Sequence, residues 1–122
     1  CLITPCEISR IINKARAFGA ATAATRVTDT IKRVDREGIV IDTLDRDELC
    51  CVQTPQVFNY HDIMDAFALI DQLDEKYTDD NMIYERSGRR VYTVDVCADN
   101  IKITEPRDIL LAELILKERE NV

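Results

Sequence analysis

Glycine and proline are scarce in this chain, with three of each among 122 residues, and tryptophan is absent. The glycines, Gly19, Gly38 and Gly88, stand far apart. The sequence therefore contains no glycine-rich turn of the kind whose backbone amides cradle a nucleotide phosphate. It also lacks an apolar run near the ~20 residues that a membrane-spanning helix needs. We expect a cytoplasmic, globular protein that does not contact a membrane.

Basic residues are outnumbered by acidic ones. The formal net charge is -7 and the isoelectric point is about 4.7. This field repels polyanions, so a hold on DNA or RNA through neutralised phosphates is excluded, and we expect no nucleic-acid partner. Any phosphate ligand must meet a local group of cations.

Cysteines are odd in number and form no C-x-x-C pair; they are Cys1, Cys6, Cys50, Cys51 and Cys97. This pattern argues against a disulfide framework and against a tetrahedral zinc site, and we expect free, buried thiols. The single histidine, His61, lies in a helical pattern with no cysteine at helical spacing. Catalysis by a cysteine nucleophile is therefore set aside, and His61 is expected to be exposed.

The first segment has the marks of a capped helix. Thr4 and Glu7 form a capping box around Pro5, apolar residues follow at helical spacing, and Phe18-Gly19 ends the run. Residues 20–25 are small and weakly apolar, which favours a buried strand. Two β-branched runs between Thr28 and Leu44 then predict a β-hairpin, whose charged flanks indicate that it projects from the body.

The second half predicts further helices and one more strand. Asn59 can cap a helix that buries Ile63, Ala66, Phe67, Ile70 and Leu73. Thr78 is expected to open another helix, which Gly88 closes, and residues 91–96 read as a strand. Residues 104–106 begin a last helix, for which the apolar residues available for burial are Ile109, Leu110, Ala112, Leu114 and Leu116.

This order of elements predicts an α/β protein with few strands for its helices. Such a narrow sheet is hard to stabilise alone, so we expect the missing strands upstream of Cys1 or in a partner chain. Cys1 is not an initiator methionine, and a helix cap follows it at once, which suggests a chain cut from a longer one.

Short segments in a fixed order carry a family resemblance. They are Thr28-Asp29-Thr30-Ile31-Lys32, Leu44-Asp45-Arg46, Gln53-Thr54-Pro55-Gln56-Val57-Phe58, Thr78-Asp79-Asp80 and Asn100-Ile101-Lys102-Ile103-Thr104. Together with the lengths between them, they resemble the 2-C-methyl-D-erythritol 4-phosphate cytidylyltransferase family along essentially the whole chain. Ribitol 5-phosphate cytidylyltransferases share much of the pattern and are the close competitor.

The resemblance implies the C-terminal half of a Rossmann-like nucleotidyltransferase domain, so that residues 1–122 are a partial domain. It implies a dimerisation arm at about residues 28–46, which completes the acceptor site of a second identical subunit. The implied reaction transfers CMP from CTP to the polyol phosphate, with Mg²⁺ as cofactor. By matching positions, Lys102 would be catalytic, beside the reacting phosphates. The implied substrate-binding residues are Thr30, Arg46, Thr54 and Thr78.

Each of these residues also has an ordinary structural interpretation. Lys102 could be a solvated charge, and Arg46 a surface ion-pair partner of the neighbouring aspartates. Thr78 could simply cap a helix, and Thr54 could belong to a turn before proline. Acidic residues after Thr78 favour a helix dipole, so we assign no metal ligands in this chain.

Parts of the family pattern are absent from these residues. The opening strand, the glycine-rich loop over the triphosphate, a second lysine and the Asp-bearing stretch for Mg²⁺ all belong upstream of Cys1. We therefore expect the chain alone neither to bind CTP well nor to turn over. A non-catalytic dimerisation module that keeps the arm is the alternative from another functional class.

Overall fold

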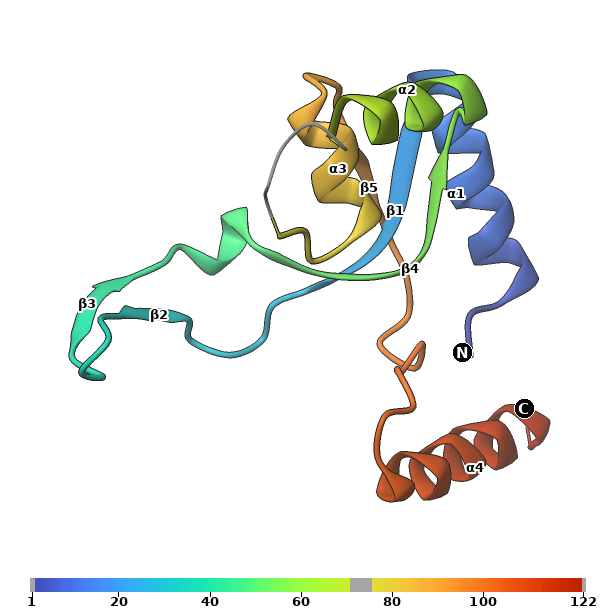
Figure 1. Ribbon diagram of the computed structural model, residues 1–122. Coiled ribbons are helices and arrows are strands. Elements are labelled where there is room, and N and C mark those ends of the chain that lie inside the picture. The colour runs from blue at the N-terminus through green and yellow to red at the C-terminus, as the bar shows by residue number, and fades with distance from the viewer. Residues whose placement is uncertain (1, 71–75, 122) are drawn as a thin grey trace.

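The computed structural model describes residues 2–70 and 76–121 (Figure 1). In chain order its elements are α1 (Pro5–Phe18), β1 (Ala20–Arg26), β2 (Lys32–Val34), β3 (Val40–Thr43), the 3₁₀ turn η1 (Arg46–Glu48), β4 (Cys50–Phe58), α2 (Tyr60–Ile70), α3 (Asp80–Arg86), β5 (Tyr92–Asp95) and α4 (Pro106–Glu120). A three-stranded sheet, in the order β4-β1-β5, forms the body, and β2 and β3 form a separate two-stranded sheet.

Helix α1 begins and ends as the sequence predicts. The Thr4 hydroxyl accepts from the Glu7 amide at 3.3 Å, and the Glu7 carboxylate accepts from the Thr4 amide at 2.8 Å. The helix ends at Gly19, whose φ of 95° lies in the region that favours glycine. This turn leads directly into β1.

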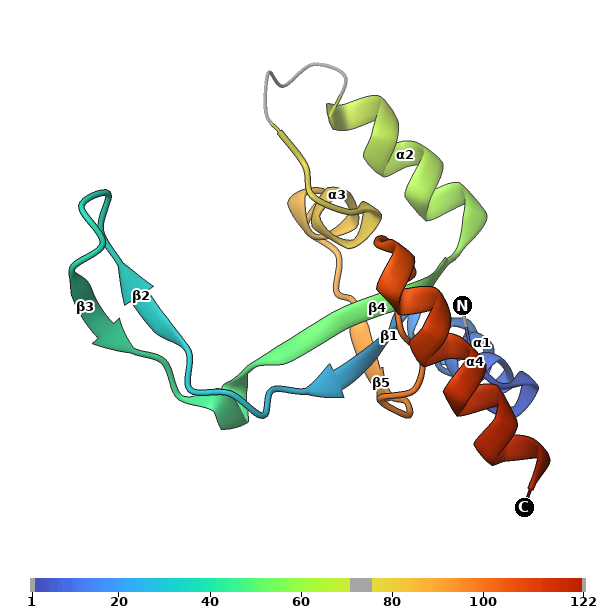
Figure 2. The ribbon, with the colours of Figure 1, turned by 90° about the horizontal axis from the view of Figure 1, so that it is seen from below.

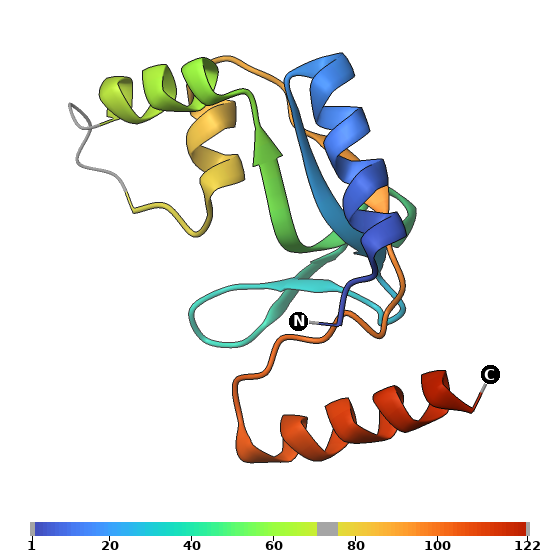
Figure 3. The ribbon, with the colours of Figure 1, turned by 90° about the vertical axis from the view of Figure 1, so that its right-hand side faces the viewer.

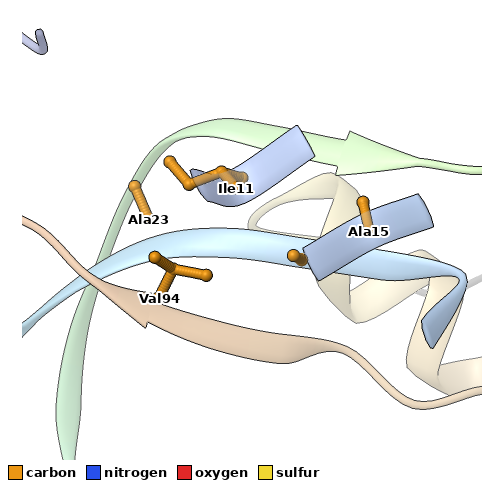
Figure 4. Packing of buried hydrophobic residues seen from close by; sticks show 5 residues of the cluster. Ile11, Ala15, Ala23 and Val94 are labelled. Atoms are coloured by element: carbon orange, nitrogen blue, oxygen red, sulfur yellow. The ribbon is translucent and has the colours of Figure 1, made fainter. Parts of the chain in front are cut away.

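Strand β1 is the buried centre of the sheet. It pairs antiparallel with β4 and parallel with β5, which confirms the predicted α/β class. Its small alanines allow α1 to approach closely, so that Ile11 and Ala15 pack on Ala23 and on Val94 of β5 (Figure 4). Close packing of this kind fixes the sheet against the helix.

Strand β4 was not predicted from the sequence. It contains Pro55, which lacks an amide donor, and it has no clear apolar alternation, so the usual strand signals are missing. Its register explains how the proline is accommodated: Thr22 pairs with Gln56 and Ala24 pairs with Val52. Residues 53–55 therefore bulge out opposite a single residue of β1. The alternative of a turn at Thr54 is wrong.

The hairpin of β2 and β3 projects from the body as expected (Figures 1 and 2). At its base the Leu44 amide donates to the Ile31 carbonyl at 3.0 Å. Its apolar side chains are more than half exposed: Val34 53%, Ile39 59%, Val40 55% and Ile41 62%. We call residues 28–46 the arm.

Helices α2 and α3 pack against each other beside the sheet. Asn59 caps α2 as predicted, because its Oδ1 accepts from the His61 amide at 3.0 Å, and His61 is exposed. Ala66 and Ile70 are buried against α3. Phe67 is 38% exposed instead of buried. The predicted contact of Leu73 lies outside the described residues.

Helix α4 lies apart from the sheet (Figure 3). Of the predicted apolar positions Ala112 is buried, and Ile115 is buried beside it. Ile109, Leu110, Leu114 and Leu116 remain exposed, because α4 does not lie on a face of the sheet. No helix among the described residues is long and apolar enough to span a membrane.

The cysteines that the structure describes do not follow the prediction of burial. Cys6, Cys50, Cys51 and Cys97 are free thiols, and all four are exposed. Cys6 lies in the first turn of α1, Cys50 and Cys51 lie at the start of β4, and Cys97 lies in the loop after β5, where burial is not required. Cys1 lies outside the described residues.

Candidate active site

A cleft of about 680 Å³ lies where β4, the start of α3 and the loop after β5 meet. Its walls include Thr54 and Gln56 from β4, Thr78 and Asp79 before α3, and Asn100 and Lys102 from the loop. Three of the predicted site residues, Thr54, Thr78 and Lys102, are therefore brought together. A second hollow, of about 570 Å³, lies beside α1 and β5 and contains none of the predicted residues.

The bulge in β4 shapes the first wall of this cleft. Because residues 53–55 leave the strand ladder, their carbonyls need other donors. The Gln53 carbonyl accepts from the Thr22 hydroxyl at 3.3 Å. The Thr54 carbonyl accepts from the Asn100 side-chain amide at 2.9 Å. The peptide bond between Thr54 and Pro55 is cis.

The second wall is the start of α3, where Asp79 is the N-cap. Its Oδ1 accepts from the Met82 amide at 3.0 Å, and its Oδ2 accepts from the side chains of Gln56 and Asn81 at 3.1 and 3.2 Å. The prediction that Thr78 caps this helix is wrong by one residue, because the capping hydrogen bond is accepted by the side chain of Asp79. The Thr78 hydroxyl is left at the cleft, where it donates weakly to the Met82 sulfur at 3.9 Å.

The third wall is the loop that carries Lys102, whose side chain is exposed. Where the loop begins, the Cys97 amide donates to Glu7 at 2.7 Å. Where it ends, the Thr104 amide and hydroxyl donate to Asp108 at 2.9 and 3.1 Å. The loop is thus attached to α1 at one end and to α4 at the other.

Two carboxylates at these attachments have lowered pKa values. Burial by itself would raise the pKa of Glu7, but hydrogen bonds from the backbone amides of Cys97 and Thr4 outweigh this effect and lower it. Hydrogen bonds from the backbone amides of Thr104 and Glu105 lower the pKa of the exposed Asp108. Both groups are therefore held as anions by backbone donors.

The remaining predicted residues, Thr30 and Arg46, lie on the arm and not among the cleft residues of this chain. Both are exposed. The Arg46 guanidinium donates to the Thr28 carbonyl at 3.0 Å, which closes the base of the arm. This bond brings the two ends of the arm together at its base, and β2 and β3 extend from there away from the three-stranded sheet (Figure 2).

The comparisons with known proteins decide the family. The sequence profile of 2-C-methyl-D-erythritol 4-phosphate cytidylyltransferase matches residues 1–118. The chain belongs to this family. A cytidylyltransferase of that name from Pelotomaculum thermopropionicum is 43% identical over 120 residues, which cover 98% of this chain and 50% of that protein. Another from Desulforamulus reducens is 44% identical over 118 residues, which cover 97% of this chain and 50% of that protein.

Solved structures agree with this assignment and confirm the predicted fold. The crystal structure of 4-diphosphocytidyl-2C-methyl-D-erythritol synthase from Anaerococcus prevotii superposes with a TM-score of 0.88 at 31% identity, and covers 95% of this chain and 54% of that one. The cytidylyltransferase of Thermus thermophilus superposes with a TM-score of 0.82 at 28% identity, covering 95% and 57%. The chain spans about half the length of the curated relatives that it matches.

Sequence reasoning gave no role to Asn100 or Gln56, although both lie within the segments that carry the resemblance. A usable signal exists for Asn100: an amide side chain close to a cationic residue in a short strand-to-helix connection can hold that connection in place. Gln56 carries no such signal, because its partner Asp79 becomes its neighbour only in the folded chain.

Among the described residues, no group of three or more histidine, cysteine, aspartate or glutamate side chains could hold a metal ion. In particular, Asp79 is engaged by the Met82 amide and by the side chains of Gln56 and Asn81. The side chains of residues 2–70 and 76–121 therefore do not fit a Mg²⁺ site.

Proposed function

We propose that the complete polypeptide containing this chain transfers CMP from CTP to 2-C-methyl-D-erythritol 4-phosphate, a step of the non-mevalonate route to isoprenoids. In this reaction an oxygen of the acceptor phosphate attacks the α-phosphorus of CTP. The bond between that phosphorus and the bridging oxygen breaks, and pyrophosphate leaves. The observation that carries the proposal is the meeting of Thr54, Thr78 and Lys102 in one cleft, in a chain of this family.

Lys102 is the proposed catalytic residue. Nucleotidyl transfer redistributes negative charge over the oxygens at phosphorus, and a fixed cation stabilises that charge without gaining or losing a proton. The ammonium group of Lys102 is exposed at the cleft, where a phosphate can reach it. The Thr54 and Thr78 hydroxyls can donate to the acceptor phosphate or accept from the hydroxyls of the polyol.

The arm supports a second part of the proposal, that the enzyme is a homodimer. Thr30 and Arg46 lie away from the cleft of their own chain, and the apolar residues of the hairpin are more than half exposed. An isologous dimer would cover these residues and place the Arg46 guanidinium near the partner's acceptor phosphate, which it can grip with two bonds.

Mg²⁺ and the cytoplasm complete the proposal. The metal ligands, and the groups that hold the CTP triphosphate, are expected outside these residues. The substrates are multiply charged phosphates, which do not cross an apolar membrane core unaided. An enzyme that uses them is therefore placed in the cytoplasm.

The direct test is an assay of the full-length protein, which measures the release of pyrophosphate from CTP in the presence of Mg²⁺ and a polyol phosphate acceptor. Release with 2-C-methyl-D-erythritol 4-phosphate at a kcat/KM at least ~10⁴ M⁻¹s⁻¹, an ordinary value for an enzyme, is expected. Release with ribitol 5-phosphate alone would replace the proposed acceptor. A stable dimer that is silent with both acceptors would favour a non-catalytic dimerisation module and overturn the proposal.

The dimer has its own test, because Arg46→Ala and Lys102→Ala subunits should complement each other. Each variant alone is expected to be nearly inactive. After unfolding and refolding together, equal amounts should recover about a quarter of the wild-type rate, since half of the dimers are hybrids with one intact site of two. No recovery, with hybrids shown by mass spectrometry, would mean that Arg46 acts within its own chain, and an Arg46→Ala variant that is fully active by itself would mean that Arg46 does not act in the reaction.

A further inference from the structure

Asn100 connects the Lys102 loop to the bulged part of β4. It is only 4% exposed. Its side-chain nitrogen donates to the Thr54 carbonyl at 2.9 Å and to Gln53 Oε1 at 3.0 Å. A backbone carbonyl can only accept, so the amide nitrogen of Asn100 must face Thr54.

The bulge is the reason that this bond is available. In a regular antiparallel ladder the Thr54 carbonyl would accept from a neighbouring strand or face solvent. Here residues 53–55 lie opposite Ala23 alone, which turns the carbonyl toward the loop after β5. A side chain from that loop donates the hydrogen bond that the carbonyl lacks. The distortion of β4 and the placement of the loop therefore depend on each other.

The loop itself is compact around Asn100. The Asn100 amide donates to the Cys97 carbonyl at 3.2 Å, and the Ile101 amide donates to the Asp99 carbonyl at 2.8 Å. The ends of the loop are attached to Glu7 and Asp108. Asn100 therefore anchors the middle of the loop to the wall that carries Thr54, and Lys102 lies two residues further along the chain.

We propose that Asn100 is a positioning residue, which holds the Lys102 ammonium in register with Thr54 across the cleft. This inference rests on the proposed function, because the two residues then contact the reacting phosphates and the acceptor respectively. In this role Asn100 acts through Lys102 and Thr54 and not on the reacting atoms. Its buried amide supplies the donor that the Thr54 carbonyl lacks at the bulge, and so sets the distance between the two functional walls.

Asn100→Asp is the matched test in the full-length protein, because it keeps the size of the side chain and replaces the amide donor by an acceptor. The aspartate would face the Thr54 carbonyl oxygen and could not bond to it, so the loop should move away. We expect kcat to fall about 10- to 100-fold, as for a reacting group displaced by ~1 Å. KM for CTP should change less than about 3-fold, since the CTP cradle is expected outside these residues.

A merely structural role would give a different pattern. The control is Ile11→Val, at a fully buried position of the α1 core, which should lower Tm and leave kcat within about 2-fold of wild type. If kcat of Asn100→Asp falls no more than that of Ile11→Val, the inference is overturned. Should Asn100→Asp fail to fold, Asn100→Ser supplies the same comparison, because its hydroxyl is too short to reach Thr54.

A second readout does not depend on activity. Amide hydrogen exchange of residues 100–103 should accelerate at least 10-fold in Asn100→Asp beyond any change in Ile11→Val, because the anchor of the loop is lost. If the wild type is inactive with both polyol phosphates, the proposed function fails while this measurement still decides the anchoring. Unchanged exchange at these residues would overturn the inference even in an active enzyme.

Discussion

The side chain of Gln56 in β4 donates a hydrogen bond of 3.1 Å to Asp79, the N-cap of α3. This bond joins the start of the helix to the strand. Thr78, the residue immediately before Asp79, lies at the cleft. The polar wall before α3 is therefore placed by the same strand that carries Thr54. The bulge side and the helix side of the cleft share β4 as a common support.

The first prediction concerns Asp79. Replacing it by alanine removes both the cap and the Gln56 bond, which should lower the free energy of unfolding by about 1–2 kcal/mol and raise KM for the polyol phosphate. Asp79→Asn keeps a good capping residue and should lose less than about 1 kcal/mol. Denaturant unfolding and steady-state kinetics measure both effects.

Asp80→Ala is the control for this series, since Asp80 is an exposed residue of the same helical turn. This substitution should lower the free energy of unfolding by about a few tenths of a kcal/mol, because it removes a negative charge from the N-terminal end of the helix dipole. Equal effects at both positions would show that the bond between Gln56 and Asp79 contributes nothing specific.

The second prediction concerns Lys102. Lys102→Met keeps the length of the side chain and removes the charge, so kcat should fall about 10²- to 10³-fold with a small change in stability. Lys102→Arg should restore only part of the rate, because a planar guanidinium does not reproduce a compact ammonium. Lys117→Met, on the exposed surface of α4, is the matched control. A Lys102→Met enzyme with wild-type kcat would remove Lys102 from the chemistry.

The third prediction concerns Glu7 and its dependence on pH. Its pKa is lowered in the folded chain because backbone donors from Cys97 and Thr4 outweigh the effect of burial. A lowered folded pKa means that the ionised form stabilises the protein. That stabilisation is complete above the unfolded pKa, at about pH 4, and is lost as the pH falls through the folded value.

Glu7→Gln should therefore lower the free energy of unfolding at pH 7 by about 1.5–3 kcal/mol, the range for hydrogen bonds to a charged group. The difference from wild type should shrink between pH 5 and pH 3, because protonation removes the same charge. Urea unfolding at both pH values measures it, with the exposed Glu113→Gln as control. A difference that does not vary with pH would contradict the assignment.

The fourth prediction concerns Gly19. Its φ is +95°, and an added Cβ would lie 3.0 Å from the Tyr84 hydroxyl. Gly88 has a φ of +81°, with no atom within 4 Å of an added Cβ. Gly88→Ala should thus lose about 1–2 kcal/mol of stability through the backbone alone, and Gly19→Ala should lose more. Adding Tyr84→Phe to Gly19→Ala should recover part of the additional loss of stability, since it removes the hydroxyl that the new Cβ meets. Equal losses at both glycines would show that the Tyr84 side chain moves aside without cost.

Local sequence determined the elements whose signals lie within a few residues of one another. The Thr4 and Glu7 capping box, the glycine turn at Gly19 and the arm hairpin rest on contacts between near neighbours, and β1 is marked by its own run of small apolar residues. All are present in the structure. The α/β class followed from their order. The motif residues Thr54, Thr78 and Lys102 could be selected from the sequence alone, through their resemblance to a family.

Only the tertiary structure decided how these residues meet. Strand β4 forms although Pro55 weakens it locally, because β1 pairs with it on both sides of the bulge. Asn100 and Thr54 are 46 residues apart in the chain, and Gln56 and Asp79 are 23 apart, so no local pattern announces either bond. A bulged carbonyl obtains its donor from whichever element packs beside it, and that element is chosen by the fold as a whole.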